Sequence, residues 1–155
     1  MKKVRLFIIS FSVLFLLLFF VFLFDSPAAP VFSMPSGFYT EPFTVTISSI
    51  GKNETIYYTL DGSLPTLESP VYSHPIQVHD RKDDPNDISM ITTISYGFVE
   101  PVGNVNKIIT IRARSINNLT KTQSPVVTHS YLVGQNIFDR YSLPIISLIM
   151  EPEDL

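Results

Sequence analysis

The chain has 155 residues, no cysteine and a formal net charge of −3. Without cysteine it can form neither disulfides nor thiolate metal sites. Three of its 11 basic residues stand in the first five positions, so the remainder is more acidic than the whole, which argues against a nucleic-acid-binding protein.

The N-terminal segment predicts a membrane anchor. Lys2, Lys3 and Arg5 precede nineteen uncharged, mostly apolar residues, Leu6 to Phe24. As a helix rising about 1.5 Å per residue, this run nearly covers the ~30 Å hydrocarbon core, and it is longer than the apolar region of a cleaved signal peptide. We therefore expect residues 1–24 to be a single transmembrane signal anchor in the cell membrane, with the C-terminal domain outside the cytoplasm. Secretion after signal cleavage is the alternative.

The next segments predict a spacer and a first hairpin. Residues 25–30 contain two prolines and are expected to form a stiff linker between membrane and domain. The run 43–48 alternates strictly, and its apolar residues Phe43, Val45 and Ile47 are expected to face the core. A turn at 51–53 is then predicted to pair this run with the following strand.

The stretch 55–60 predicts a strand in the middle of the fold. Ile56, Tyr58 and Leu60 alternate with threonine and tyrosine, side chains that suit a pleated, half-buried surface. Asp61-Gly62 is a dipeptide typical of tight hairpin turns, and Pro65 prevents an immediate return to a central ladder. We therefore expect the chain to reverse here.

The second half of the domain alternates loops and strands. Residues 69–78 predict a short strand that ends at Val78, and the charged run 80–87 predicts a surface loop. The pattern of 90–104 is weak. Strand character returns in 105–116, and the last strand is expected at 126–133.

Together these runs predict an all-β fold class. Short strands with frequent turn signals indicate an antiparallel immunoglobulin-like β-sandwich over residues 31–134, after the single transmembrane helix. Ile47, Tyr58 and Ile111 are expected in its core, with Ile109 and Ala113 on the same face as Ile111.

The C-terminal residues 135–155 predict a linker and a new strand. Residues 135–142 are mostly polar, and 143–149 form a fresh apolar run. Because no further strand is predicted to pair with it, we expect this run to be the first strand of a second, truncated domain.

No catalytic, cofactor-binding or metal-binding set is predicted. His74, His79 and His129 lack the spacing of a metal site. The run 80–87 could offer carboxylates to calcium, but the EF-hand pattern is absent and a solvated loop is favoured. Its acidic residues are Asp80, Asp83, Asp84 and Asp87.

Three further patterns have ordinary explanations. Ser63 and Ser69 come with no motif that supplies a base and an orienting acid. Five aromatic residues could form a sugar-stacking platform, although sheet packing is favoured because the chain has no tryptophan: Tyr57, Tyr58, Tyr72, Tyr96 and Phe98. Asn53-Glu54-Thr55 and Asn118-Leu119-Thr120 match the short N-glycosylation sequon, which commonly arises by chance.

One resemblance covers about residues 31–133. The run Ile56-Tyr-Tyr-Thr-Leu-Asp-Gly-Ser-Leu-Pro-Thr66, followed by Ser69-Pro-Val-Tyr72 and Pro75-Ile76, resembles the β-sandwich module at the C-terminal end of chitobiases and β-hexosaminidases and beside family-29 glycoside hydrolases. The resemblance implies an accessory module without catalytic residues of its own.

A second resemblance spans nearly all of the chain after the apolar run, and its motifs are Asp80-Arg81, Asp84-Pro-Asn86, Ile111-Arg-Ala-Arg-Ser115, Val126-Val-Thr-His-Ser-Tyr131 and Arg140-Tyr-Ser-Leu-Pro-Ile-Ile-Ser-Leu148. They are similar to the region that precedes the kinase-like domain of CotH-type spore-coat proteins. The resemblance implies a bacterial source and a parent protein that phosphorylates coat or cell-surface proteins. Because the kinase-like domain itself is not in this sequence, we expect no enzyme activity.

The sequence therefore predicts a non-catalytic, membrane-anchored, extracytoplasmic accessory or interaction module without cofactors, the N-terminal part of a CotH-like spore-coat or cell-surface protein. Its expected partners are the membrane, through residues 6–24, and a coat or surface protein. One alternative is a module that binds cell-wall glycan. Another is a non-functional fragment of a split or frameshifted gene.

Overall fold

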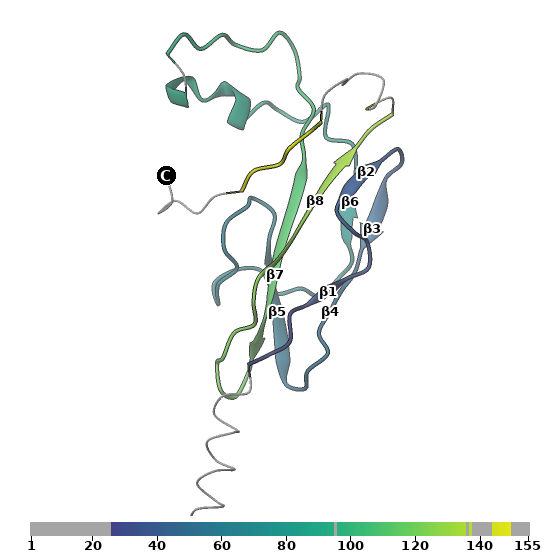
Figure 1. Cartoon of the computed structure of the whole chain (residues 1–155), viewed down its shortest axis with the longest axis vertical. Helices are drawn as coiled ribbons and strands as arrows, with labels where there is room; N and C mark the ends of the chain where they lie inside the picture. The colour runs from purple at the N-terminus through teal and green to yellow at the C-terminus, as the bar shows by residue number, and fades with distance from the viewer. Residues whose placement is uncertain (1–25, 95, 136, 138–143, 150–155) are drawn as a thin grey trace, which may run out of the picture.

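The structure is a computed structural model that describes residues 26–94, 96–135, 137 and 144–149 (Figure 1). The predicted transmembrane helix lies outside these residues. Within the described part, no helix has the length and apolar character needed to cross a bilayer. Most regular structure there is strand, arranged in small sheets as a β-sandwich-like fold.

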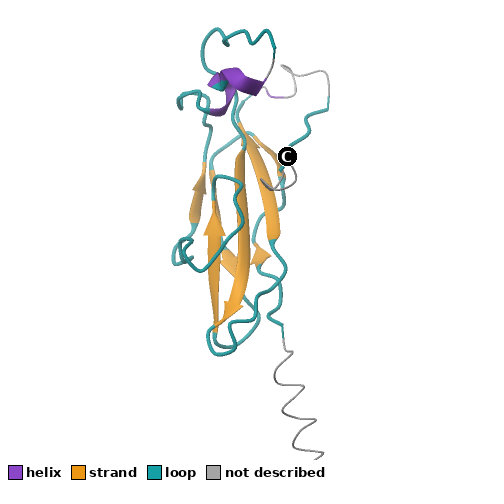
Figure 2. Ribbon diagram, turned by 90° about the vertical axis from the view of Figure 1, so that its left-hand side faces the viewer, coloured by secondary structure: helices purple, strands orange, loops and turns teal. Residues whose placement is uncertain are grey.

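The described elements are, in chain order, β1 (Val31–Phe32), β2 (Gly37–Tyr39), β3 (Phe43–Val45), β4 (Ile47–Ser48), β5 (Glu54–Thr59), β6 (Ile76–Val78), the single-turn 3-10 helices η1 (Ile88–Met90) and η2 (Thr92–Ile94), β7 (Ile109–Asn117) and β8 (Val127–Val133). The strands run along the long axis of the molecule, and loops gather at its two ends (Figure 2). The 3-10 turns belong to the loop at the end opposite residue 26.

Two layers enclose the core. One is a four-stranded sheet in the order β2-β8-β7-β5, and the other consists of the antiparallel pairs β1–β4 and β3–β6. Buried apolar side chains from both layers meet between them: Val45, Ile47, Ile56, Ile76, Val78, Ile109, Ile111, Ala113, Tyr131 and Val133. Burial of each large aliphatic side chain stabilises the fold by about 1.5–3 kcal/mol relative to exposure.

The period-2 patterns correctly placed the apolar side chains of 43–48 and β7, whereas in the run 55–60 Leu60 is exposed and Thr59 is buried. Val45 and Ile47 are buried while Thr44 and Thr46 are exposed, and Ile109, Ile111 and Ala113 are buried together on β7. Tyr58 is half-buried and packs against the same cluster. Alternation places one side of a strand against the other layer, so the faces follow from the sequence.

The predicted strand pairing is wrong in two respects. The run 43–48 does not form a hairpin with β5, because β3 pairs with β6, β4 pairs with β1, and β5 pairs with β7. The turn at 51–53 instead carries the chain from one layer to the other, with Asn53 at a φ of 58°. Nor is β5 the middle strand: β7 lies between β5 and β8.

The sandwich is not purely antiparallel as predicted, because β2 and β8 are parallel. Gly37, Phe38 and Tyr39 lie opposite Tyr131, Leu132 and Val133. Parallel pairing needs a long connection between the two strands, and here nearly the whole domain provides it.

The Asp61-Gly62 turn is wider than the tight hairpin that the dipeptide predicted. Gly62 has a φ of 87°, and the Asp61 carboxylate accepts hydrogen bonds from the backbone N–H and the hydroxyl of Ser63 at 3.0 and 2.6 Å. The returning chain pairs with β5 only at Val71, which forms an isolated antiparallel β-bridge with Tyr57. On the other side, Arg112 Nη1 donates to the carbonyl oxygen of Gly62 at 2.7 Å, which ties the turn to β7.

The predicted spacer 25–30 is not a free linker over its described part. Pro27 and Pro30 are buried, and the Ser26 hydroxyl donates to the carbonyl oxygen of Gln123 at 3.0 Å. Because these residues pack on the sandwich, the domain begins earlier than its first strand.

The described part of the predicted C-terminal strand, residues 144–149, forms no strand. Ile146 and Leu148 are largely exposed there. An apolar run becomes a strand only when a second strand satisfies its backbone groups, and this run has no strand partner in the described part of the chain.

Candidate functional site

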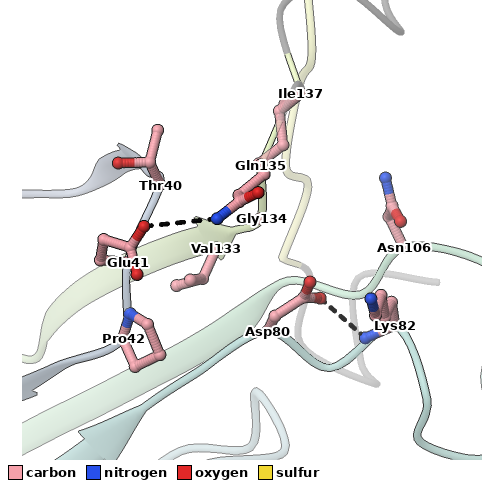
Figure 3. A pocket seen from close by; sticks show the side chains of 10 residues that line it. All are labelled: Thr40, Glu41, Pro42, Asp80, Lys82, Asn106, Val133, Gly134, Gln135 and Ile137. Carbon is pink, nitrogen blue, oxygen red and sulfur yellow. Dashed lines mark hydrogen bonds between the residues drawn. The ribbon is translucent and has the colours of Figure 1, made fainter.

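A cleft of about 520 Å³ opens at the end of the sandwich opposite residue 26 (Figure 3). We call it the end cleft and define it by its lining: Thr40, Glu41, Pro42, Asp80, Lys82, Asn106, Val133, Gly134, Gln135 and Ile137. These residues come from four separate loops and the end of one strand.

Strand register brings these segments together. Tyr39 at the end of β2 lies opposite Val133 at the end of β8, and the Gly134 N–H donates to the Tyr39 carbonyl oxygen at 2.9 Å. Val78 at the end of β6 lies opposite Phe43 at the start of β3. The loops that follow β2, β6 and β8 therefore surround one opening.

The charged and amide side chains of the end cleft make few internal bonds. Gln135 Nε2 lies 3.5 Å from Glu41 Oε1, a long hydrogen bond (Figure 3). Asp80 Oδ1 accepts from the backbone N–H of Lys82 at 2.9 Å. A Cβ on Gly134 would lie 3.5 Å from Asp80 Oδ2, so this carboxylate faces the end of β8.

The loop beneath the opening is fixed by two side chains. Asn86 donates to the carbonyl oxygen of Gly103 at 2.9 Å and accepts from the N–H of Val105 at 3.1 Å. Lys107 Nζ donates to the carbonyl oxygen of Val105 at 2.9 Å. The Asn86 bonds hold the end of the 80–87 loop against the segment that leads into β7, and a 3.5 Å contact from Lys107 Nζ to the Arg81 carbonyl oxygen links the start of the loop to the same segment.

The end cleft offers hydrogen-bond donors and acceptors. Amide, hydroxyl and ammonium donors stand beside the two carboxylates of Glu41 and Asp80, and none of the described lining residues is aromatic. Glu41, Lys82 and Gln135 are exposed, so the opening is accessible to water and to a ligand from solvent. Such a lining suits a polar, hydroxylated or peptide ligand.

The structure disperses the three histidines. His74 and His79 are exposed at different loops, and His74 Nδ1 lies 2.8 Å from the Ser73 hydroxyl. His129 is half-buried on β8, where it stacks on Phe32 with ring centroids 4.5 Å apart, and burial lowers its pKa from the ordinary value. Among the described residues, no group of three or more His, Cys, Asp or Glu could hold a metal ion.

The aspartates of the 80–87 loop form hydrogen bonds within the loop or are exposed to solvent. Asp84 accepts from Arg81 Nε at 2.6 Å, and this bond is the main cause that holds the pKa of Asp84 below its ordinary value. Asp83 and Asp87 are exposed. The loop is therefore a solvated surface, as the sequence predicted.

The two serines considered as nucleophiles serve turns. The Ser63 hydroxyl donates to Asp61, and its side-chain and backbone bonds lower the pKa of Asp61. The Ser69 hydroxyl accepts from the Thr66 N–H at 2.9 Å. Neither bond reaches a histidine.

The five aromatic residues do not form one platform. Tyr58 and Tyr72 meet edge to face, with centroids 6.3 Å apart, and both pack against the core. Tyr57 belongs to the opposite face of β5, and Tyr96 is fully exposed in the loop after η2. Tyr58 and Tyr72, the two tyrosines that are in contact, therefore contribute to the packing of the sandwich.

The two sequons lie side by side at the end that holds residue 26. The Asn118 N–H donates to the Asn53 carbonyl oxygen at 2.7 Å, and the Thr55 hydroxyl donates to the Asn118 side-chain oxygen at 2.9 Å. Both asparagines are exposed. The Asn118 side chain and the Asn53 backbone are thus part of a turn structure that explains these residues without a glycan.

Comparison with known protein families finds a match for the first part of the sandwich. Residues 34–96 match the chitobiase/beta-hexosaminidase C-terminal domain. This chitobiase-type segment includes β2 to β6 and both 3-10 turns, whereas β7 and β8 lie beyond it. Domains of this type are usually non-catalytic accessory modules. No curated protein and no solved structure matches the chain.

The residues of the end cleft were missed by sequence reasoning. Glu41, Asn106 and Gln135 stand in separate loops, and none belongs to a local motif. The only sequence signal was the turn composition around them, which shows that the loops exist without showing that they converge. Within the chitobiase-type segment, Thr40 to Pro42 and Asp80 to Lys82 contribute to the cleft.

Proposed function

We propose that this chain is a non-catalytic accessory module that residues 6–24 hold at the cell membrane, with the sandwich outside the cytoplasm and able to bind a coat or surface protein. The observation that carries the proposal is the chitobiase-type segment at 34–96. Domains of this type are usually non-catalytic accessory modules.

Two further observations support a non-catalytic role. A glycosidase needs two carboxylates that converge across a sugar, and a kinase needs a phosphate-binding loop, a lysine and carboxylates for magnesium. In the described residues the candidate nucleophiles Ser63 and Ser69 are used in turns, and the regular elements are strands apart from the 3-10 turns η1 and η2 and the helical residue Ile137.

The finer proposal is that the module is the N-terminal part of a CotH-like protein. It rests on the motifs quoted above, from Asp80-Arg81 to the segment ending at Leu148. Sequencing of the DNA beyond codon 155 tests it: a kinase-like reading frame, in frame or shifted, supports the proposal, and unrelated sequence refutes it.

Activity assays test the absence of catalysis. The full chain, purified in mild detergent, is incubated with ATP, magnesium or manganese and a coat-protein substrate, and separately with chromogenic glycosides. We expect no turnover above a heat-treated control. Turnover that persists in independent preparations would refute the accessory role.

Membrane attachment and sidedness are tested in intact cells. Because the chain has no cysteine, Val102→Cys, at a fully exposed position in the loop after η2, gives a single site for a membrane-impermeant maleimide. We expect labelling of intact cells and retention in the membrane after alkaline carbonate extraction. Labelling only after lysis would place the sandwich inside the cytoplasm.

Glycan binding is the second candidate, and the polar lining of the end cleft favours it. Glu41, Asn106 and Gln135 offer donors and acceptors for sugar hydroxyls, although the described lining residues include no aromatic ring on which a sugar could stack. Sedimentation of the chain with insoluble peptidoglycan tests this candidate. Binding that Gln135→Ala weakens and the exposed control Thr44→Ala leaves unchanged would support it.

A further inference from the structure

Two loops at the end that holds residue 26 share an unusual composition. We call residues 49–53 and 118–121 the base loops. Each presents one large aliphatic side chain to solvent: Ile50 is 74% exposed and Leu119 is 70% exposed. Each also carries one exposed lysine, Lys52 or Lys121, and these are the only charged residues within the two loops.

The base loops form one surface. The Asn118 N–H donates to the Asn53 carbonyl oxygen at 2.7 Å, so the loop tips are fixed side by side. Within the first loop the Ser49 hydroxyl donates to the Glu54 carboxylate, and a Cβ on Gly51 would collide with that carboxylate. The carboxylate of Glu54, the first residue of β5, is thereby bonded within the loop.

The chain enters the domain beside these loops. Residues 26–28 line a second cleft, of about 470 Å³, together with residues of both base loops. Ser26 is bonded to the carbonyl oxygen of Gln123, and Pro27 is buried. The first described residue is therefore fixed to the sandwich at its base.

The length of chain between the apolar run and this fixed point is short. Only Asp25 separates Phe24 from Ser26, so their Cα atoms are at most roughly 7 Å apart. The headgroup region on each side of a bilayer is roughly 5–8 Å thick, judged from the difference between total and hydrocarbon thickness. If Phe24 ends the hydrocarbon segment, the base of the sandwich stands within the depth of the headgroups.

We propose that the base loops rest on the lipid headgroups of the membrane that holds residues 6–24, with Ile50 and Leu119 inserted at the interface and Lys52 and Lys121 beside anionic phosphates. This inference rests on the proposed membrane anchoring. Aliphatic residues flanked by lysine bind an interface through buried apolar area and attraction to anionic lipid.

The charge of the two ends supports this orientation. The far end carries an excess of carboxylates over the Arg81 and Lys82 side chains, in the loop with Asp80, Asp83, Asp84 and Asp87. An anionic surface attracts each nearby lysine by a factor of roughly five in affinity and repels the aspartates. The module thus stands upright, and the end cleft is directed away from the bilayer.

Single-cysteine labelling of the full chain tests the contact. Ile50→Cys and Leu119→Cys are each labelled with a polarity-sensitive fluorophore, with Val102→Cys as the matched exposed position at the opposite end. The chains are placed, one per nanodisc, in phosphatidylcholine with or without phosphatidylglycerol, after circular dichroism has shown that each is folded. We expect a shift of emission to shorter wavelength at positions 50 and 119 and no shift at 102.

A charge-reversal variant tests the lysines. In the chain labelled at position 119, Lys52→Glu together with Lys121→Glu should reduce the shift and remove its dependence on phosphatidylglycerol. Because both lysines are exposed, their replacement leaves the core unchanged.

The outcomes separate the inference from the anchoring on which it rests. A chain that alkaline carbonate removes from membranes refutes the anchoring and the base-loop contact together. A chain that stays in the lipid but has the same emission at positions 119 and 102 keeps its anchor and refutes the contact alone. A shift that appears only with two or more chains per disc assigns the base loops to a second copy of the chain and also refutes the lipid contact.

Discussion

Replacement of Ile111 by alanine is the most direct test of the core. Ile111 lies on β7 between β5 and β8, and its exposed fraction is 0%. The change removes three carbon atoms, which at ~0.8 kcal/mol per methylene is a transfer loss of about 2.4 kcal/mol. The cavity left behind adds to this loss, so we expect the free energy of unfolding to fall by about 3–4 kcal/mol, within the usual range for such changes.

Urea unfolding of the full chain in mild detergent measures the effect. Tyrosine fluorescence is a suitable signal, because the chain has seven tyrosines and no tryptophan. Ile111→Val should cost only about 0.5–1.5 kcal/mol because it removes a single carbon. Ile50→Ala is the matched control: the same substitution at a largely exposed site should change stability by less than ~0.5 kcal/mol.

The comparison of the two alanine variants decides the result. If Ile111→Ala and Ile50→Ala cost the same, Ile111 is not in the core, and the assignment of the β7 faces is wrong. A loss near 1 kcal/mol at Ile111 would instead mean that the layers collapse around the missing atoms, which contradicts a rigid sandwich.

Three smaller predictions concern the turn and β8. Gly62→Ala should cost about 1–2 kcal/mol in the same assay through backbone strain alone, because φ is 87° and no atom lies within 4 Å of the new Cβ; Gly37→Ala should be far milder. Arg112→Met should cost about 1–3 kcal/mol, because it leaves the Gly62 carbonyl without its donor, and an unchanged urea midpoint would contradict that role. Burial lowers the pKa of His129, so the folded state binds this proton less tightly than the unfolded chain. The stability that neutral His129 contributes to the fold is fully present above about pH 6.5, and it is lost as the pH falls towards the lowered pKa. His129→Gln should flatten this part of a stability–pH profile, and an unaltered slope would count against the assignment.

The sequence predicted which face of a strand is buried, but it did not predict which strands pair with each other. Val45, Ile47 and Ile111 were placed correctly because alternation along a strand reports which side is buried. The same alternation is expected whichever strand lies beside it in the sheet, so it does not identify the neighbour. The sequence therefore led to a hairpin of neighbouring segments where the chain crosses between layers.

Arg112 shows how long-range structure overrides a local pattern. This charged residue of β7 is only 8% exposed, because the distant turn at Asp61-Gly62 lies against it and accepts a hydrogen bond from its guanidinium. The end cleft has the same origin. Glu41 and Gln135 meet because strand ends from distant parts of the chain align, and no local sequence rule carries that information.

The pairing of β2 with β8 also dictates when the module can fold. Ser36, just before β2, accepts from the backbone N–H of Ser130, and the two residues are 94 positions apart. At a synthesis rate of about 5–20 residues per second, the first strand of this pair waits roughly 5–20 s for its partner. Until Val133 has been made, the chitobiase-type segment has the strand edges of β2 and β5 without β8 and β7, and bare edges of this kind pair between chains. Recombinant production of this module therefore has to extend at least through Val133, because a piece that ends at residue 96 lacks half of its larger sheet.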